Sequence, residues 1–149
     1  MAHYAFIDEN NIVVNTIVGI DEDDTTKLPD EYSSWEEFYS AQKGGMTCLR
    51  TSYNTQHNQH KLGGTPFRGN YGGKGSTYDA ENDIFIPVKP ALLDSWIFDV
   101  SQAKWIPPID LPPDREFEST AWIEEHTTWQ DPETLQIWNN ESQQWEDLP

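Results

Sequence analysis

Short apolar runs near the start of the chain predict a β-hairpin. Residues 4–7 are apolar, and residues 12–20 are rich in Ile, Val and Thr, which strands favour. Between them, residues 8–11 read Asp-Glu-Asn-Asn, and Asp and Asn side chains readily accept hydrogen bonds from the backbone of a turn. A third run, residues 46–53, predicts another strand.

Residues 33–42 carry a helical pattern. Trp35, Phe38 and Tyr39 have the spacing that places side chains on one face of a helix. Two serines that can cap the first turn open the segment, with glutamates three residues on, and a pair of glycines follows it. We therefore expect one short helix near residues 33–42.

From residue 78 onward, three segments share one pattern: an aromatic residue, then Asp or Asn, then a second aromatic residue. The three aromatic pairs are Tyr78 with Phe85, Phe98 with Trp105, and Trp138 with Trp145. Turn-forming and polar residues separate the members of each pair, so we expect short hairpins whose aromatic side chains pair across the two strands. A further turn is expected at residues 131–133, which would make residues 121–147 a three-stranded meander.

Together these elements predict a mainly β fold. We expect short antiparallel hairpins and meanders in a small sandwich or barrel-like arrangement, with one short helix. Proline pairs at residues 107–108 and 112–113 indicate a stiff linker. The predicted domains are an N-terminal β-rich domain over residues 1–110 and a C-terminal Trp-rich β-meander over residues 111–149.

One long, polar, glycine-rich segment covers residues 54–77. Loops of this length without structure are uncommon in compact domains unless they are functional. We expect this loop to dock a partner, and the candidate docking residues are His57, His60, Arg68, Asn70 and Tyr71. A zinc site would need more His, Cys or carboxylate ligands than the two histidines supply, so we expect no metal here.

Composition and charge limit the function further. The 149 residues include 7 Trp, 6 Tyr and 6 Phe, and the formal net charge is −17. Aromatic side chains bury large areas, so the chain can fold although only 36% of its residues are hydrophobic. The negative charge opposes binding to nucleic-acid phosphates and to anionic membranes. Cys48 is the one cysteine, so no intrachain disulfide can form, and we expect it to be a small buried apolar residue.

Targeting and catalytic motifs are missing from the sequence. We find no signal-peptide pattern and no apolar run of membrane-spanning length, so we expect folding in the cytoplasm. The phosphate loop, the His-Glu-x-x-His motif, the nucleophile elbow and the Cys-x-x-Cys motif are also missing. We therefore expect a protein that is not an enzyme and uses no cofactor.

Four short motifs carry a resemblance to a known group of proteins. They are residues 51–54 (TSYN), 68–72 (RGNYG), 77–79 (TYD) and 82–87 (NDIFIP). With the opening Met-Ala-His-aromatic hairpin and the closing Trp-marked hairpins, the chain resembles small virion-associated structural proteins of tailed phages that infect cyanobacteria and other marine bacteria. The likeness excludes residues 21–41, and it departs from the pattern at residues 74–76, where a more apolar pair is expected. It implies a structural protein of the particle, with no catalytic residues.

Four functions follow as hypotheses. The first is a capsid decoration protein, made in the host cytoplasm, that sits on the particle surface, binds the major capsid protein or other virion proteins, and can form a homo-oligomer there. The second is a tail fibre or baseplate component. The third is a carbohydrate-binding module that meets a host surface glycan through the candidate exposed aromatics Trp122, Trp129, Trp138 and Trp145. The fourth, a DNA mimic, would need its acids in regular rows, and here they are scattered.

Overall fold

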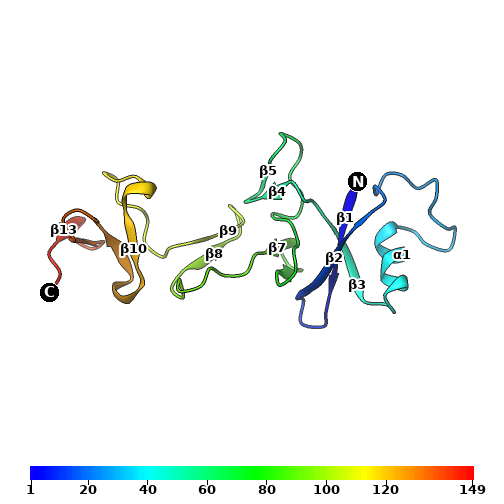
Figure 1. Cartoon of the computed structure of the whole chain (residues 1–149), viewed down its shortest axis with the longest axis horizontal. Coiled ribbons are helices and arrows are strands. Elements are labelled where there is room, and N and C mark those ends of the chain that lie inside the picture. Colours follow the sequence, from blue (N-terminus) through cyan, green and yellow to red (C-terminus); the bar gives the residue numbers. More distant parts are fainter. The chain divides into compact units, whose positions relative to one another are not determined.

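A computed structural model describes all residues 1–149 and has mainly β structure with a single α-helix, as the sequence predicted (Figure 1). The strands pair antiparallel in small sheets, and no closed barrel forms. The chain divides into two compact units: unit 1 comprises residues 1–88 and 98–104, and unit 2 comprises residues 89–97 and 105–149. This division differs from a single cut near residue 110, because residues 98–104 belong to unit 1.

Unit 1 is built on a three-stranded sheet with strand order β2-β1-β3. Its strands are β1 (Ala2–Ile7), β2 (Val13–Gly19) and β3 (Thr47–Thr51). The predicted N-terminal hairpin is confirmed, and its turn is closed by Asp8, whose carboxylate accepts hydrogen bonds from the backbone N–H groups of Asn10 and Ile12. The central strand β1 is buried along almost its whole length.

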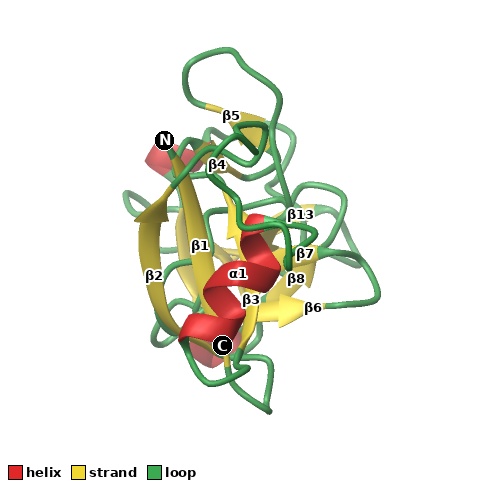
Figure 2. Cartoon of the chain, turned by 90° about the vertical axis from the view of Figure 1, so that its right-hand side faces the viewer, coloured by secondary structure: helices red, strands yellow, loops and turns green.

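Alternate residues of β1 contribute to two separate hydrophobic clusters, because successive side chains point to opposite faces of a sheet. Tyr4 and Phe6 pack with Trp35 and Cys48 on the face that carries the helix α1 (Trp35–Gln42) (Figure 2). Ala5 and Ile7 pack on the other face, in a cluster with Phe85. Cys48 is buried as expected, and burial raises the pKa of its thiol to about 12.

The helix begins at the caps that the sequence predicted. The Ser34 hydroxyl accepts a hydrogen bond from the Glu37 backbone N–H at 3.1 Å. In return, the Glu37 carboxylate accepts hydrogen bonds from the backbone N–H and the hydroxyl of Ser33. These reciprocal bonds satisfy groups that would otherwise lack partners at the first turn.

Three two-stranded sheets follow β3. Their strands are β4 (Thr55–Gln56) with β5 (Gln59–His60), β6 (Thr77–Asp79) with β7 (Ile84–Ile86), and β8 (Ile97–Asp99) with β9 (Lys104–Ile106). Tyr78 lies directly opposite Phe85, with 5.3 Å between the ring centroids, so this predicted aromatic pair is confirmed. The turn between them is held by Asp79, whose carboxylate accepts from the backbone N–H groups of Glu81 and Asn82.

Unit 2 contains a four-stranded meander in chain order. Its strands are β10 (Ala121–Ile123), β11 (Thr128–Gln130), β12 (Ile137–Asn139) and β13 (Gln144–Glu146), with short 3-10 helices at Phe117–Ser119 and Glu124–His126. Trp138 faces Trp145 across β12 and β13, as predicted. The expected three strands are four, because Thr127 adopts a positive φ of 50° after the second 3-10 helix and reverses the chain there. Trp122 and Trp129 thereby form a second cross-strand pair.

Candidate functional site

The predicted docking loop, residues 54–77, separates into parts with different surroundings. We call residues 54–66 the finger and residues 67–72 the anchor. The anchor is half-buried or buried, whereas most of the finger is exposed. The finger projects from unit 1 in two perpendicular views (Figures 1 and 2). The five candidate docking residues therefore do not form one surface.

Arg68 of the anchor ties together three parts of unit 1. Its guanidinium pairs with Asp83 at 2.8 Å and with Glu36 of the helix at 3.3 Å. It also donates a hydrogen bond of 2.8 Å to the backbone oxygen of Arg50, and it lies over the ring of Phe67. Because its Nε and Nη1 groups are already engaged inside the unit, Arg68 stabilises the fold of unit 1.

Asn70 is almost fully buried, with 3% of its surface exposed, so the prediction that it docks a partner from the surface is wrong. Its side-chain oxygen accepts from the His57 backbone N–H at 2.8 Å. Its amide donates to the backbone oxygens of Phe85 and Ala103 at 3.0 and 2.9 Å. A buried amide persists where it satisfies backbone groups that would otherwise lack partners, and Asn70 satisfies three.

Gly72 ends the anchor in close contact with the core. A Cβ atom at this position would lie 2.8 Å from the Phe85 ring, so only glycine lets the backbone approach so closely. Its N–H donates to the Thr51 hydroxyl at 2.7 Å, and its oxygen accepts from the Thr16 hydroxyl at 2.6 Å. The anchor is thus fixed to the sheet through side chains of β2 and β3.

The finger is ordered by its own backbone contacts. His57 and Asn58 both have positive φ angles, 49° and 58°, which is the geometry of a tight two-residue hairpin turn between β4 and β5. Further along, His60 Nδ1 accepts hydrogen bonds from the backbone N–H groups of Leu62 and Gly64 at 3.2 and 3.0 Å. Residues 61–66 are all exposed, so the finger presents a defined backbone to its surroundings.

A polar cavity of about 390 Å³ lies beside the finger turn. Its lining residues are His57, Asn58, Gln59, Ser101, Gln102 and Lys104. Burial, together with the nearby charge of Lys104, lowers the pKa of His57. Behind the cavity, hydrogen bonds from Ser101 and Gln102 hold the pKa of Asp99 at about 2. The cavity can exchange hydrogen bonds with a polar ligand, and sequence spacing could not reveal it because residues 101–104 lie far along the chain from the finger.

Tyr71, the last candidate docking residue, belongs to an aromatic cluster. Its ring centroid lies 5.4 Å from that of Tyr53 and 5.8 Å from that of His3, and His3 stacks on Tyr53 at 5.5 Å. Tyr53 keeps 61% of its surface exposed. Burial and the N-terminal ammonium lower the pKa of His3. Tyr71 was a candidate in the sequence, whereas His3 and Tyr53 were not, because no sequence pattern connects them with Tyr71.

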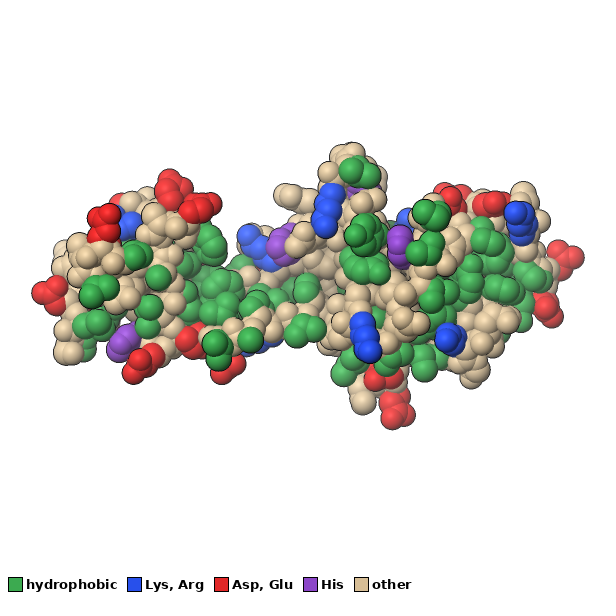
Figure 3. All heavy atoms as spheres, in the orientation of Figure 1, with side chains coloured by type: hydrophobic (Ala, Val, Ile, Leu, Met, Phe, Trp, Pro, Cys, Tyr) green, Lys and Arg blue, Asp and Glu red, His purple; other side chains and the backbone are tan.

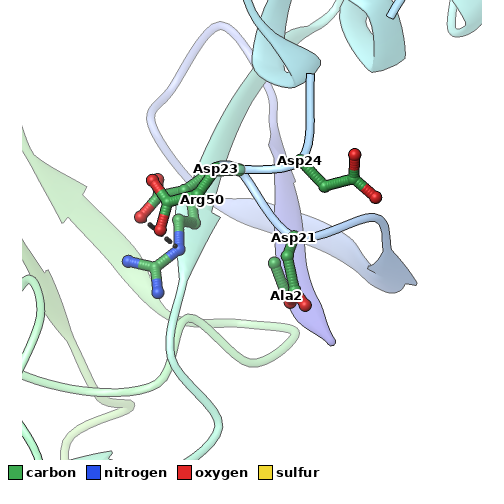
Figure 4. A pocket seen from close by; sticks show the side chains of 6 residues that line it. Ala2, Asp21, Asp23, Asp24 and Arg50 are labelled. Atoms are coloured by element: carbon green, nitrogen blue, oxygen red, sulfur yellow. Dashed lines mark ion pairs between the residues drawn. The ribbon is translucent and has the colours of Figure 1, made fainter. Parts of the chain in front are cut away.

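A second cavity of about 390 Å³ lies near the N-terminus, at the acidic run of residues 21–24 (Figure 4). Arg50 forms an ion pair with Glu22 at 3.1 Å, and the N-terminal ammonium pairs with Asp21 at 2.7 Å. These pairs neutralise part of the local charge. No group of three or more His, Cys, Asp and Glu side chains in the chain is arranged to hold a metal ion.

Two of the four tryptophans expected to be exposed are buried, so that prediction is wrong for them. Trp129 is 2% exposed and Trp138 is 6% exposed. Trp129 Nε1 donates to the backbone oxygen of Ile109 at 3.0 Å. The meander strands are only three residues long, so large aromatic rings supply most of the area that unit 2 can bury.

Trp122 and Trp145 are half-buried, and both rings are engaged. Trp122 Nε1 donates to Glu124 at 2.9 Å, and this bond is the main reason for the lowered pKa of that carboxyl. The guanidinium of Arg115 lies 4.6 Å from the centroid of the Trp145 ring. Trp122 and Trp145 therefore have less free aromatic face than a sugar platform would require.

Charge is unevenly distributed around the finger. Residues 38–78 contain five Lys and Arg residues and no Asp or Glu, although 26 of the 149 residues of the chain are acidic. Basic and histidine side chains, without acidic ones, accompany the projecting finger on the face seen in Figure 3. This acid-free segment is visible in the sequence, and charge patterning would have identified it there.

No helix in this chain combines the length and the apolar character that crossing a membrane requires. Comparisons with protein-family models, with curated proteins and with solved structures found no match to this chain.

Proposed function

We propose that this protein is a structural component of a tailed-phage virion, a capsid decoration protein that binds the major capsid protein on the outer surface of the particle. The observation that carries the proposal concerns the motifs on which the resemblance to virion proteins rests. Their residues contact one another: Gly72 binds Thr51, Arg68 binds Asp83, and Asn70 binds the backbone of Phe85. The shared motifs therefore specify a scaffold, which is what a family of structural proteins would have in common.

The charge of the chain supports the same role. A net charge of −17 keeps copies soluble and limits nonspecific association. A protein displayed at high density on a particle needs both properties. Within this proposal the finger contributes to contacts between neighbouring polypeptides on the particle, because it is exposed, ordered and free of acidic side chains.

Quantitative mass spectrometry of purified particles tests the proposal. A decoration protein is expected at a copy number comparable with that of the major capsid protein. A copy number far below that of the major capsid protein would indicate a position in the tail or baseplate. Particles that lack the chain altogether would overturn a structural role in the virion.

Sugar binding is a second candidate, and one observation favours it: the exposed ring of Tyr53, which clusters with the half-buried His3 and Tyr71. Exposed aromatic rings can stack on the apolar face of a sugar. Glycan-array binding that is lost in Tyr53→Ala and kept in Leu92→Ala, which alters an 85% exposed residue in unit 2, would support this candidate. A wild-type chain that binds no glycan on the array would remove it.

A further inference from the structure

The tip of the finger presents an apolar side chain beside a cationic one. Leu62 is 78% exposed, and its neighbour Lys61 is also exposed. The backbone there is held before any partner arrives, because the Lys61 N–H donates to the Asn54 oxygen at 2.8 Å and His60 fixes the N–H of Leu62. An ordered loop loses little conformational entropy when it binds, so this tip is suited to insertion into a partner.

Unit 2 contains a cavity with matching chemistry. Its volume is about 300 Å³, and its lining residues are Asp110, Leu111, Pro112, Pro113, Trp138, Asn140 and Gln143. Leu111 and Pro113 supply most of its accessible apolar surface, since Pro112 and Trp138 are buried, and the exposed Asp110 adds a carboxylate. An apolar side chain next to an ammonium group would meet suitable partners in this cavity.

The charges of the two regions are complementary. The finger lies within the acid-free segment, residues 38–78, whereas unit 2 carries twelve acidic residues against two cationic ones. Both cations of unit 2 are already engaged, Arg115 with Asp114 and Asp131, and Lys89 with the backbone oxygen of Asp94. Unit 2 therefore attracts a cationic group, and Lys61 at the tip of the acid-free finger supplies one.

We propose that the finger of one copy of this chain inserts into the unit 2 cavity of a second copy, with Leu62 against Leu111 and Pro113 and the Lys61 ammonium paired with Asp110. The two surfaces differ, so the contact either closes reciprocally in a two-fold dimer or repeats from copy to copy in a ring or in a chain. One finger tip buries less area than a stable permanent interface does, so the association is weak and depends on concentration. This contact does not depend on the proposed virion role, because it can be tested with the purified protein alone.

Sedimentation velocity of the purified chain over a range of concentrations is the first experiment. We expect reversible association at physiological NaCl, where the repulsion between copies that each carry a net charge of −17 is screened. Leu62→Asp is expected to abolish it. Leu92→Asp is the matched control, since Leu92 is also exposed, and it should leave the association unchanged. A chain that stays monomeric at every concentration, or an association that Leu62→Asp does not change, overturns the proposal.

A charge reversal tests the pairing itself. Lys61→Asp and Asp110→Lys should each weaken association roughly tenfold, and the double variant should restore it. Both residues are exposed, so circular dichroism should show that all three variants fold. Failure of the double variant to recover would contradict the pairing of Lys61 with Asp110.

Cross-linking of the wild-type chain gives a result that does not depend on any variant. A carbodiimide that joins amines to carboxylates without a spacer, applied to a mixture of ¹⁴N- and ¹⁵N-labelled protein, should give a peptide pair in which Lys61 and Asp110 carry different labels. A cross-link found only within one label would mean an intrachain contact and would overturn the assignment to a second copy.

Discussion

The finger and the anchor are neighbours in sequence and both are polar and glycine-rich. Polar side chains of the anchor bond inside unit 1, whereas most of those of the finger are exposed. In the anchor, Asn70 makes three hydrogen bonds inside unit 1, and Gly72 lies against the Phe85 ring. In the finger, the exposed side chain of Asn58 makes one long hydrogen bond, 3.4 Å to the Ser101 oxygen. A polar, glycine-rich sequence can therefore be a buried scaffold or a free surface, and the difference lies in which backbone groups its side chains satisfy.

This difference narrows the surface that can dock a partner. Residues 67–72 hold the sheet, the β6–β7 hairpin and residues 98–104 together, so changes there should act on stability. In the finger, the buried Thr55 accepts hydrogen bonds from the N–H groups of Phe67 and Tyr71, but residues 61–66 are all exposed, so changes at those tip residues should act on binding. Substitutions in the two regions should therefore differ in their effect on the free energy of unfolding.

Asn70→Ala should reduce the free energy of unfolding by about 3 kcal/mol or more, because it leaves three backbone groups without their partner in a buried site. Asn58→Gly is the matched control, because glycine tolerates the positive φ of 58° at this position, and it should change the free energy of unfolding by less than about 0.5 kcal/mol. Urea denaturation followed by tryptophan fluorescence measures both. Equal effects of the two substitutions would contradict the distinction between anchor and finger.

Gly72→Ala should cost about 1–3 kcal/mol, because the new methyl group would overlap the Phe85 ring. The next residue supplies the comparison: a Cβ atom at Gly73 would lie 3.5 Å from the Tyr71 ring, an ordinary contact. Gly73→Ala should therefore change stability by less than about 0.5 kcal/mol. Thermal unfolding of the two variants measures the difference, and a Gly72→Ala protein as stable as Gly73→Ala would show that the close approach is not required.

The pKa of His57 should lie below its ordinary value of 6.5 in the folded chain, because burial and the charge of Lys104 disfavour the imidazolium. The unfolded chain then binds a proton more readily than the folded one, so this group lowers stability as pH falls below 6.5 and has no effect well above it. NMR titration of the imidazole should show the low pKa, and Lys104→Gln should raise it part of the way. Lys61→Gln is the control, and an unshifted His57 in the wild type would contradict the packing of the finger turn.

Leu62→Ala should have the smallest effect on folding, within about 0.5 kcal/mol, because the side chain is 78% exposed. Chemical denaturation of the variant beside the wild type measures it. A loss of stability comparable with that of Asn70→Ala would mean that the finger tip is part of the core and is not available to a partner.

Local signals in the sequence predicted much of the fold. The first hairpin, the capped helix, and the Tyr78–Phe85 and Trp138–Trp145 pairs each depend on residues close together in the chain, where turn chemistry and spacing act. The role of Asn70 could not be predicted, because its partners lie 15 and 33 residues further on. The prediction that Trp129 and Trp138 are exposed was wrong for the same reason, since their burial depends on contacts between distant segments and not on local spacing.

A reconstruction of the virion at side-chain resolution would show what the finger touches. We expect density for this chain on the outer surface of the capsid, repeated over the lattice, with residues 54–66 packed against another polypeptide and residues 67–72 enclosed within unit 1. Particles without the chain, or a chain on the particle whose finger faces solvent and touches nothing, would contradict this expectation.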